Sequence, residues 1–350
     1  MLQRKKQRIS RECTENLELD LFDGLPDDLV ISIISKLASS ASSPPDFINI
    51  FLTCKRLNRL AVHPLVLSKV CFKAFAVKAR NWCDPVHRFL KQCVKAGNVE
   101  ASYTLGMIRF YCLQNRGSGA SLMAKAAIKS HAPSLYSLAV IQFNGSGGSK
   151  NDKDLSAGVA LCARAALLGH VDALRELGHC LQDGYGIRQH RAEGRRLLVQ
   201  ANARELASSL NALVKRKASQ QHHRRLNYQH YSLKTGPGCP LLSDFGCNVP
   251  TPEVHPVNVF LKEWFESGVG ELAQGLRLCS HKGCGRPETR THEFRRCSVC
   301  GTVNYCSRAC QALDWKLKHK VKCRPNEQWL EDGNGVGEIE GVVEAEELAV

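Results

Sequence analysis

The chain has 350 residues, of which 43% are hydrophobic, a length and composition that allow two or three globular domains. It contains no run of 18 or more apolar residues, so we expect no membrane span. The N-terminal MLQRKKQRIS is basic but lacks a following apolar region, which argues against a secretory signal. We therefore expect an intracellular protein of the nucleus, the cytoplasm or both, whose cysteines stay reduced or bind metal.

The net charge of +15 is unevenly distributed. Residues 326–350 hold eight acidic residues and no Lys or Arg, and we expect a disordered acidic tail there. Residues 1–20 are expected to form a disordered basic tail, in which the run from Arg4 to Arg8 is either a nuclear localisation signal or a solvated stretch. The other basic residues form no stripe that alternates with aromatic residues, so nucleic-acid binding is the weaker alternative.

Residues 21–80 predict a small helical unit. Pro26 suits the first turn of a helix, and apolar residues then recur at helical spacing. This face consists of Leu29, Val30, Ile33, Ile34 and Leu37. The Ser/Ala/Pro-rich segment 38–45 is expected to loop out, Asp46 to cap a second helix over 47–61, and a third helix to cover 65–80. The inward residues of the second helix are expected to be Phe47, Ile50, Cys54, Leu57 and Leu60.

This unit resembles the F-box, through its leading LPDDLV and its following CKRLNRL. The resemblance implies docking onto the Skp-type adaptor of a cullin-based ubiquitin ligase. It assigns the adaptor contacts to Leu25, Pro26, Leu29, Val30 and Ile33. The alternative is a plain three-helix element that packs on the residues that follow it.

Residues 81–206 contain an internal repeat. Its copies begin KAGNVEASYTLG at 95–106, KSHAPSLYSLA at 129–139 and LGHVDALRELG at 168–178, and Ala-Ala pairs follow in the second helices. Small residues let paired helices approach closely, as stacked helical repeats require. The pattern resembles Sel-one-like repeats, relatives of the tetratricopeptide family, and this resemblance implies a concave protein-binding surface.

Residues 207–272 are expected to form a linker and then an ordered lead-in. The first part is basic, polar and broken by Gly and Pro. The lead-in ends in an amphipathic segment, which we expect to pack on the following cysteine-rich unit through Phe260, Trp264 and Phe265.

Residues 273–325 hold a dense set of soft metal ligands. Eight of them occur in four close pairs: Cys279 and Cys284, Cys297 and Cys300, Cys306 and Cys310, and His319 and Cys323. Eight such ligands are enough for two tetrahedral Zn²⁺ ions. A segment of about 45 residues with few large apolar residues needs such metal ions to fold. Ser307 is expected to cap a helix that carries Cys310 in its first turn.

The order of these ligands, with the histidine second to last, resembles the MYND finger. The resemblance implies that Cys279, Cys284, Cys306 and Cys310 bind one ion and Cys297, Cys300, His319 and Cys323 the other. The first pair is more widely spaced than in the family, which leaves His281 or His292 as substitute ligands. All eight ligands would be used, so we expect structural ions and no catalytic residue.

The MYND resemblance also implies binding of a proline-containing partner peptide. Tyr305 and Trp315 could line its groove, although Trp315 could equally be a core aromatic residue.

The order of the three units resembles a family of plant F-box proteins with a C-terminal MYND finger. We expect a mainly α fold of N-terminal F-box helices, an α-solenoid of Sel-one-like helix pairs and a small two-zinc finger. The resemblance implies a non-catalytic substrate receptor that binds the adaptor and cullin complex at one end and a target protein, whose identity the sequence does not give, at the other. One alternative is a nuclear transcriptional scaffold or nucleic-acid-associated protein. Another is a methyltransferase, for which the glycine-rich loops offer no cofactor site after a strand.

Overall fold

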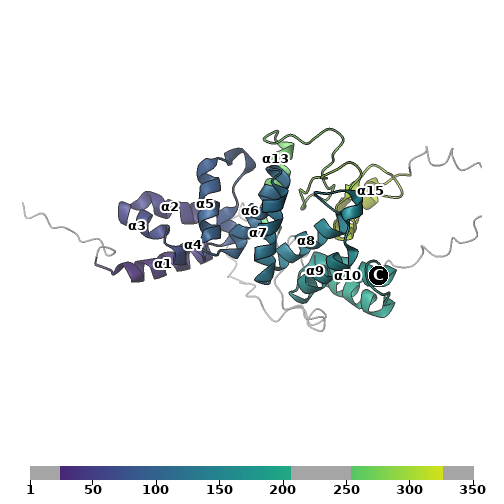
Figure 1. The fold of residues 1–350 in the computed structure, drawn as a ribbon, viewed down its shortest axis with the longest axis horizontal. Helices are drawn as coiled ribbons and strands as arrows, with labels where there is room; N and C mark the ends of the chain where they lie inside the picture. Colours follow the sequence, from purple (N-terminus) through teal and green to yellow (C-terminus); the bar gives the residue numbers. More distant parts are fainter. Residues whose placement is uncertain (1–23, 206–253, 326–350) are drawn as a thin grey trace, which may run out of the picture.

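The computed structural model describes residues 24–205 and 254–325. The two predicted tails and most of the predicted linker lie outside these residues. The described part is mainly helical and elongated, with helices α1 to α3 at one end and the cysteine-rich unit at the other (Figure 1). This confirms the predicted fold class. No helix among the described residues is both long and apolar enough to cross a membrane.

The named α-helices within residues 24–205 are α1 (Asp27–Ser40), α2 (Pro44–Thr53), α3 (Lys55–Ala61), α4 (Pro64–Leu67), α5 (Asp84–Lys95), α6 (Val99–Met107), α7 (Arg116–Ile128), α8 (Ala132–Asn144), α9 (Leu155–Leu167) and α10 (Val171–Asp183). Shorter helical turns are η1 (Phe72–Phe75), η2 (Ala79–Asn81), η3 (Ile108–Cys112) and η4 (Lys150–Asp152), and residues 191–205 form a further helix. Residues 254–325 form α13 (Pro256–Glu266), β1 (Arg295–Arg296), β2 (Asn304–Tyr305), α14 (Arg308–Asp314), η5 (Trp315–His319) and α15 (Lys320–Lys322).

The predicted loop at 38–45 is largely helical. Helix α1 continues to Ser40, and α2 already begins at Pro44. Ser43 is the N-cap of α2, whereas Asp46 lies at the third helical position and accepts hydrogen bonds from the amides of Ser42 and Ser43, each at 2.9 Å. The prediction that Asp46 caps the helix was therefore wrong, because its carboxylate reaches back to those free amides.

The second and third predicted helices are both interrupted. The second ends at Thr53, because Cys54 is extended and its sulfur accepts a bond from the amide of Leu57. Cys54 is exposed and does not face inward as predicted. The third helix is reduced to α4, η1 and η2. Where α4 ends, the Asn98 side chain donates to the carbonyls of Leu67 and Val70 at 2.9 Å each, which satisfies carbonyls that a continued helix would have paired internally.

Glycines set how closely the paired repeat helices pack. A Cβ atom on Gly119 of α7 would lie 2.7 Å from the carbonyl oxygen of Gly106 on α6. The same arrangement recurs two repeats later, where a Cβ atom on Gly194 would lie 2.8 Å from the carbonyl oxygen of Gly178. Real Cβ atoms do not approach so closely, so these crossings require glycine. His131 and His170 cap α8 and α10 through Nδ1.

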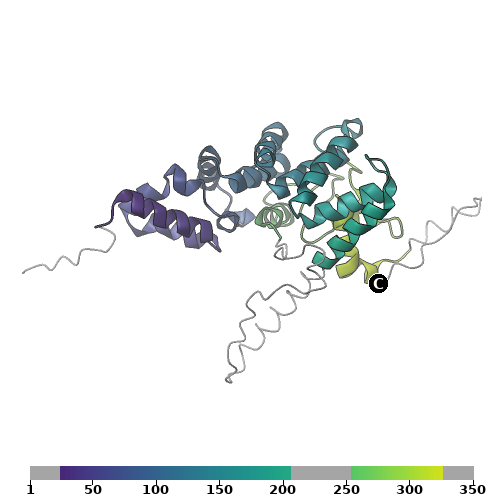
Figure 2. The same cartoon turned by 90° about the horizontal axis from the view of Figure 1, so that it is seen from below.

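Helix α13 packs mainly on the N-terminal half of the molecule. The Phe260 ring meets the edge of Trp82 at 5.5 Å between centroids, and the Glu263 carboxylate accepts a hydrogen bond from the amide of Ala79 at 3.1 Å. Figure 2 shows α13 enclosed between the first helices and the repeats. The prediction that Phe260, Trp264 and Phe265 pack on the cysteine-rich unit was wrong, because all three join the core of η1, η2 and α5 instead.

Candidate metal centre

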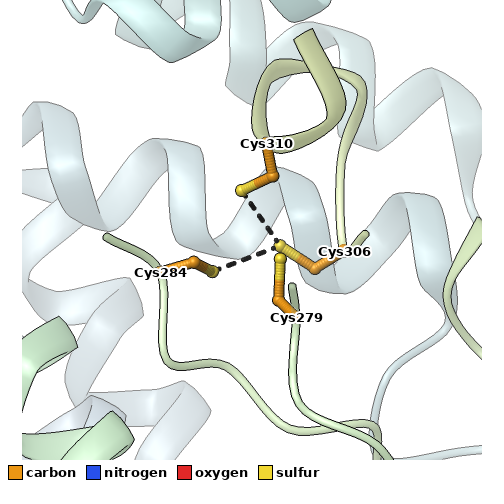
Figure 3. Close-up of side chains that lie close together, drawn as sticks. All are labelled: Cys279, Cys284, Cys306 and Cys310. Carbon is orange, nitrogen blue, oxygen red and sulfur yellow. Dashed lines mark hydrogen bonds between the residues drawn. The ribbon is translucent and has the colours of Figure 1, made fainter. Parts of the chain in front are cut away.

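The structure brings the eight predicted ligands into two groups of four. The sulfurs of Cys279, Cys284, Cys306 and Cys310 all lie within 4.8 Å of one another and form the first site (Figure 3). The ligand atoms of Cys297, Cys300, His319 and Cys323 are equally close and form the second site. Neither His281 nor His292 joins a group, and His292 instead lies 2.7 Å from a guanidinium nitrogen of Arg296.

The distances within both groups suit tetrahedral zinc. Zn–S bonds of about 2.3 Å place two sulfurs of a tetrahedron about 3.8 Å apart. In the first site the sulfur of Cys306 lies 3.4 Å from that of Cys284 and 3.6 Å from that of Cys310. In the second site the sulfurs of Cys297 and Cys323 are 3.8 Å apart. The donor sets therefore fit two structural Zn²⁺ ions with no open coordination position.

Short elements of the finger position these ligands. The antiparallel pair of β1 and β2 holds Cys297 and Cys306 at the ends of a hairpin, which turns at Gly301 with φ of 65°. Ser307 caps α14 as predicted, and its Oγ accepts a hydrogen bond from the amide of Cys310 at 3.1 Å. His319 ends η5, and Cys323 follows one helical turn later.

The first site lies in a core that the finger shares with the repeats. Its four cysteines and Tyr305 pack with apolar residues of α8, α9 and α10. Asn144 donates to the carbonyl of Cys306 at 2.8 Å, and the Tyr136 hydroxyl donates to Ser307 Oγ at 3.0 Å. The Glu176 carboxylate accepts hydrogen bonds from the amides of Arg308 and Ala309, the first residues of α14. The finger is therefore not an independent module.

A buried arginine joins the first site to helix α8. Arg286 donates to the sulfur of Cys284 at 3.4 Å and to the Ser137 hydroxyl at 2.8 Å. Burial alone would lower the pKa of Arg286, but Cys284 and Cys306 raise it well above its usual range. No carboxylate is a hydrogen-bond or salt-bridge partner of this guanidinium among the described residues. Four thiolates around one Zn²⁺ carry a charge of about −2, which would supply the missing counter-charge.

The two predicted peptide-binding residues differ in exposure. Tyr305 is only 1% exposed, and its hydroxyl donates to Asp314 at 2.8 Å, so it cannot line a groove. Its prediction was wrong because the β2 strand turns this side chain into the shared core. Trp315 is 39% exposed beside His319 and remains available to a partner.

The predicted adaptor contacts also divide into exposed and buried residues. Leu29 and Ile33 on α1 are 50% and 37% exposed, Pro26 is exposed and Leu25 is half-buried. Val30 is completely buried in the core of the N-terminal helices, so its assignment as an adaptor contact was wrong. Periodicity assigned Leu29, Val30 and Ile33 to one apolar face, which is wider than the core can cover.

Comparison with known proteins agrees with this architecture. Residues 279–323 match the MYND finger family, and residues 72–156 match the family of plant tetratrico peptide repeats. The chain is thus a helical-repeat protein that carries a MYND-type zinc finger.

Two proteins of Arabidopsis thaliana are similar over nearly the whole chain. F-box protein At1g67340 is 68% identical over 90% of this chain and 84% of its own length. F-box protein At5g50450 is 63% identical over 95% of this chain and 94% of its own length. The chain belongs to the family of these F-box proteins.

Among solved structures, a Sel1 repeat protein from Oxalobacter formigenes aligns with 51% of this chain and 68% of its own. The TM-score is 0.36, at 13% sequence identity.

Proposed function

We propose that this protein is the substrate-recognition subunit of an SCF-type cullin ubiquitin ligase. Its N-terminal helices, residues 21–80, would dock the Skp-type adaptor. The repeats, residues 81–206, and the finger, residues 273–325, would hold the target protein. The names of the two Arabidopsis relatives support the first assignment, and the protein-binding role of repeat and MYND families supports the second.

The observation that carries the adaptor site is an exposed apolar stripe on α1. Leu29, Ile33 and Leu37 are spaced four residues apart, so they lie on one side of the helix, and Leu37 is also 49% exposed. Val30 and Ile34 lie on the other apolar side of this helix and are buried in the core. The exposed stripe of Leu29, Ile33 and Leu37 is therefore not needed for folding. An apolar helix side of this kind is typical of an interaction surface.

The proposed mechanism needs no chemistry in this chain. A receptor that holds its target near the transferring enzyme raises the effective concentration of the target at that enzyme. The stripe and the finger lie at opposite ends of the elongated molecule (Figure 1), which suits a protein that bridges two partners. We propose a non-catalytic role for this reason.

We further propose that the eight residues of the two sites coordinate the two zinc ions. At the finger, Trp315 is the residue we assign to a proline-containing partner peptide. It is 39% exposed, and its ring lies 5.7 Å from that of His319 on η5.

Affinity purification of the full chain tests the adaptor site. The double substitution Leu29→Ala/Ile33→Ala should reduce recovery of the Skp-type adaptor about 100-fold, because two large side chains contribute about 3 kcal/mol on burial. Both residues are exposed, so the fold should be unaffected. The matched control is Ile128→Ala/Leu167→Ala, which truncates two exposed residues of the repeats. Unchanged adaptor recovery in the α1 variant would contradict the proposal.

A further inference from the structure

The loop that carries two ligands of the first site is held by side chains of the repeats. Cys306 and Cys310 flank Ser307, the N-cap of α14. Tyr136 on α8 donates to the hydroxyl of Ser307, and Glu176 on α10 accepts from the first two amides of α14. Each of these three side chains is buried. Together they satisfy the N-terminal end of the helix whose first turn presents Cys310 to the metal.

A third ligand of the first site is tied to the repeats by a different route. Arg286 connects the sulfur of Cys284 to the hydroxyl of Ser137 on α8, and Ser137 in turn lies 3.1 Å from the hydroxyl of Tyr103 on α6. The ligand sulfur therefore belongs to a buried chain of hydrogen bonds that crosses into two repeats. Such partners behind the ligands fix ligand orientation and tune metal affinity.

The second site has no comparable support among the described residues. Cys323 is only half-buried, and Cys300 lies near the hydroxyl of Thr302 within the finger itself. Contacts with the repeats near this site come from Arg295, whose guanidinium lies 5.7 Å from the centre of the Tyr185 ring, and from Lys316, which donates to Glu205 at 2.8 Å. Both contacts are made by exposed basic side chains and not by a ligand.

We infer that Tyr136, Ser137 and Glu176 of the repeats are positioning residues for the first zinc ion. They hold the ligand loop in its coordinating shape, so the docked finger and the first ion form one unit. The second ion is bound by the finger alone and exchanges without disturbing the repeats. One finger thus contains one slowly and one rapidly exchanging zinc ion.

Zinc release from the full-length protein to an excess of a chromogenic chelator tests this inference. The wild type should release two ions in two phases of equal amplitude, and Cys323→Ser should abolish the fast phase alone. Tyr136→Phe and Glu176→Gln should each accelerate the slow phase about tenfold and leave the fast phase unchanged. The matched control is Ser134→Ala, which removes a buried hydroxyl of α8 whose hydrogen bond, to the carbonyl of Met123 at 2.7 Å, lies within the repeats.

Three results would overturn the inference. The first is an unchanged slow phase in both positioning variants. The second is equal acceleration of both phases, which would indicate general destabilisation. The third is the same acceleration in Ser134→Ala. Thermal unfolding followed by circular dichroism identifies variants that fail to fold, and the chemically milder Ser137→Ala then replaces them, with the same expected effect on the slow phase. The adaptor takes no part in this experiment, so its outcome is independent of the ubiquitin-ligase proposal.

Discussion

Residues 254–325 meet the first 205 residues in two places, and the two contacts are built differently. Helix α13 buries Phe260, Leu261 and Trp264 against apolar residues of η1, η2 and η3. The finger has few large apolar residues and instead places four cysteines and Arg286 against α8 and α10. Mainly apolar area holds the first contact, whereas the second needs a metal to gather its thiolates. The comparison therefore predicts that the two contacts can be broken separately.

The largest effect is expected from Cys306→Ser, which removes a ligand of the first site. Structural zinc contributes about 10 kcal/mol to the folding of small fingers. We expect bound zinc to fall from two ions per chain to one and amide exchange in residues 279–310 to accelerate at least 1000-fold, or about 4 kcal/mol. Zinc analysis and hydrogen exchange measured by mass spectrometry check both values.

Hydrogen exchange in α13 of the same Cys306→Ser variant tests whether the two contacts are independent. Its amides should keep their protection in Cys306→Ser, because no residue of this helix is a ligand. The control Cys300→Ser should also lose one ion, yet residues 279–286 and 304–310, which lie around the first site, should stay protected. Equal loss of protection in α13 and in the finger would show that the two contacts are one.

The sequence was sufficient to predict those features of the fold and the metal sites that depend on local residue spacing. The four ligand pairs, the cap at Ser307 and the small residues between repeat helices are all set within one or two turns of chain. The division of the ligands into two groups came from the family resemblance, and the structure brings the same groups together.

Contacts between distant segments could not be predicted from the sequence. Tyr136 and Ser307 are 171 residues apart, and neither has a neighbour pattern that indicates the other. Arg286 looks like one of many basic residues of a charged finger until its burial is known. The exposed state of Leu29 and Ile33 was also hidden, because helical periodicity identifies an apolar side but not what covers it.

A smaller effect is expected from Phe260→Ala in α13. Truncation of a buried phenylalanine costs about 3 kcal/mol through lost burial and a residual cavity. The ring is buried and stacks on Trp264 at 5.7 Å, so the surroundings have little freedom to collapse. Urea unfolding should show this loss, while bound zinc should stay at two ions per chain. Val259→Ala, on the exposed side of the same helix, should change stability by less than about 1 kcal/mol. Loss of zinc in Phe260→Ala would contradict the separation of the two contacts.

The smallest effect concerns a carboxylate that joins α13 to the repeats. Glu100 lies 3.3 Å from Nε2 of His255 and 3.2 Å from Nε2 of His131. The Nδ1 atoms of both histidines accept hydrogen bonds from backbone amides, so their Nε2 atoms carry the protons that point to Glu100. Burial alone would raise the pKa of Glu100, but the close approach of His131 and the hydrogen bond with His255 lower it to about 2. The pKa of His255 is lowered by burial, against the effect of Glu100.

A depressed carboxylate pKa gives stability that is present above the ordinary pKa of 4.5 and is lost as the pH falls toward about 2. Glu100→Gln should therefore reduce the free energy of unfolding by about 2 kcal/mol at pH 7. This difference in unfolding free energy should stay constant from pH 8 to 6.5, because the pKa of Glu100 lies below that range in the folded chain, at about 2, and in the unfolded chain, at about 4.5. Urea unfolding of the zinc-loaded protein at each pH measures it, with Glu266→Gln at the exposed end of α13 as a control that should remain near the wild type. A difference that shrinks already between pH 8 and 6.5 would mean that Glu100 takes up its proton in that range, and that the carboxylate does not hold α13 in place through these two histidines.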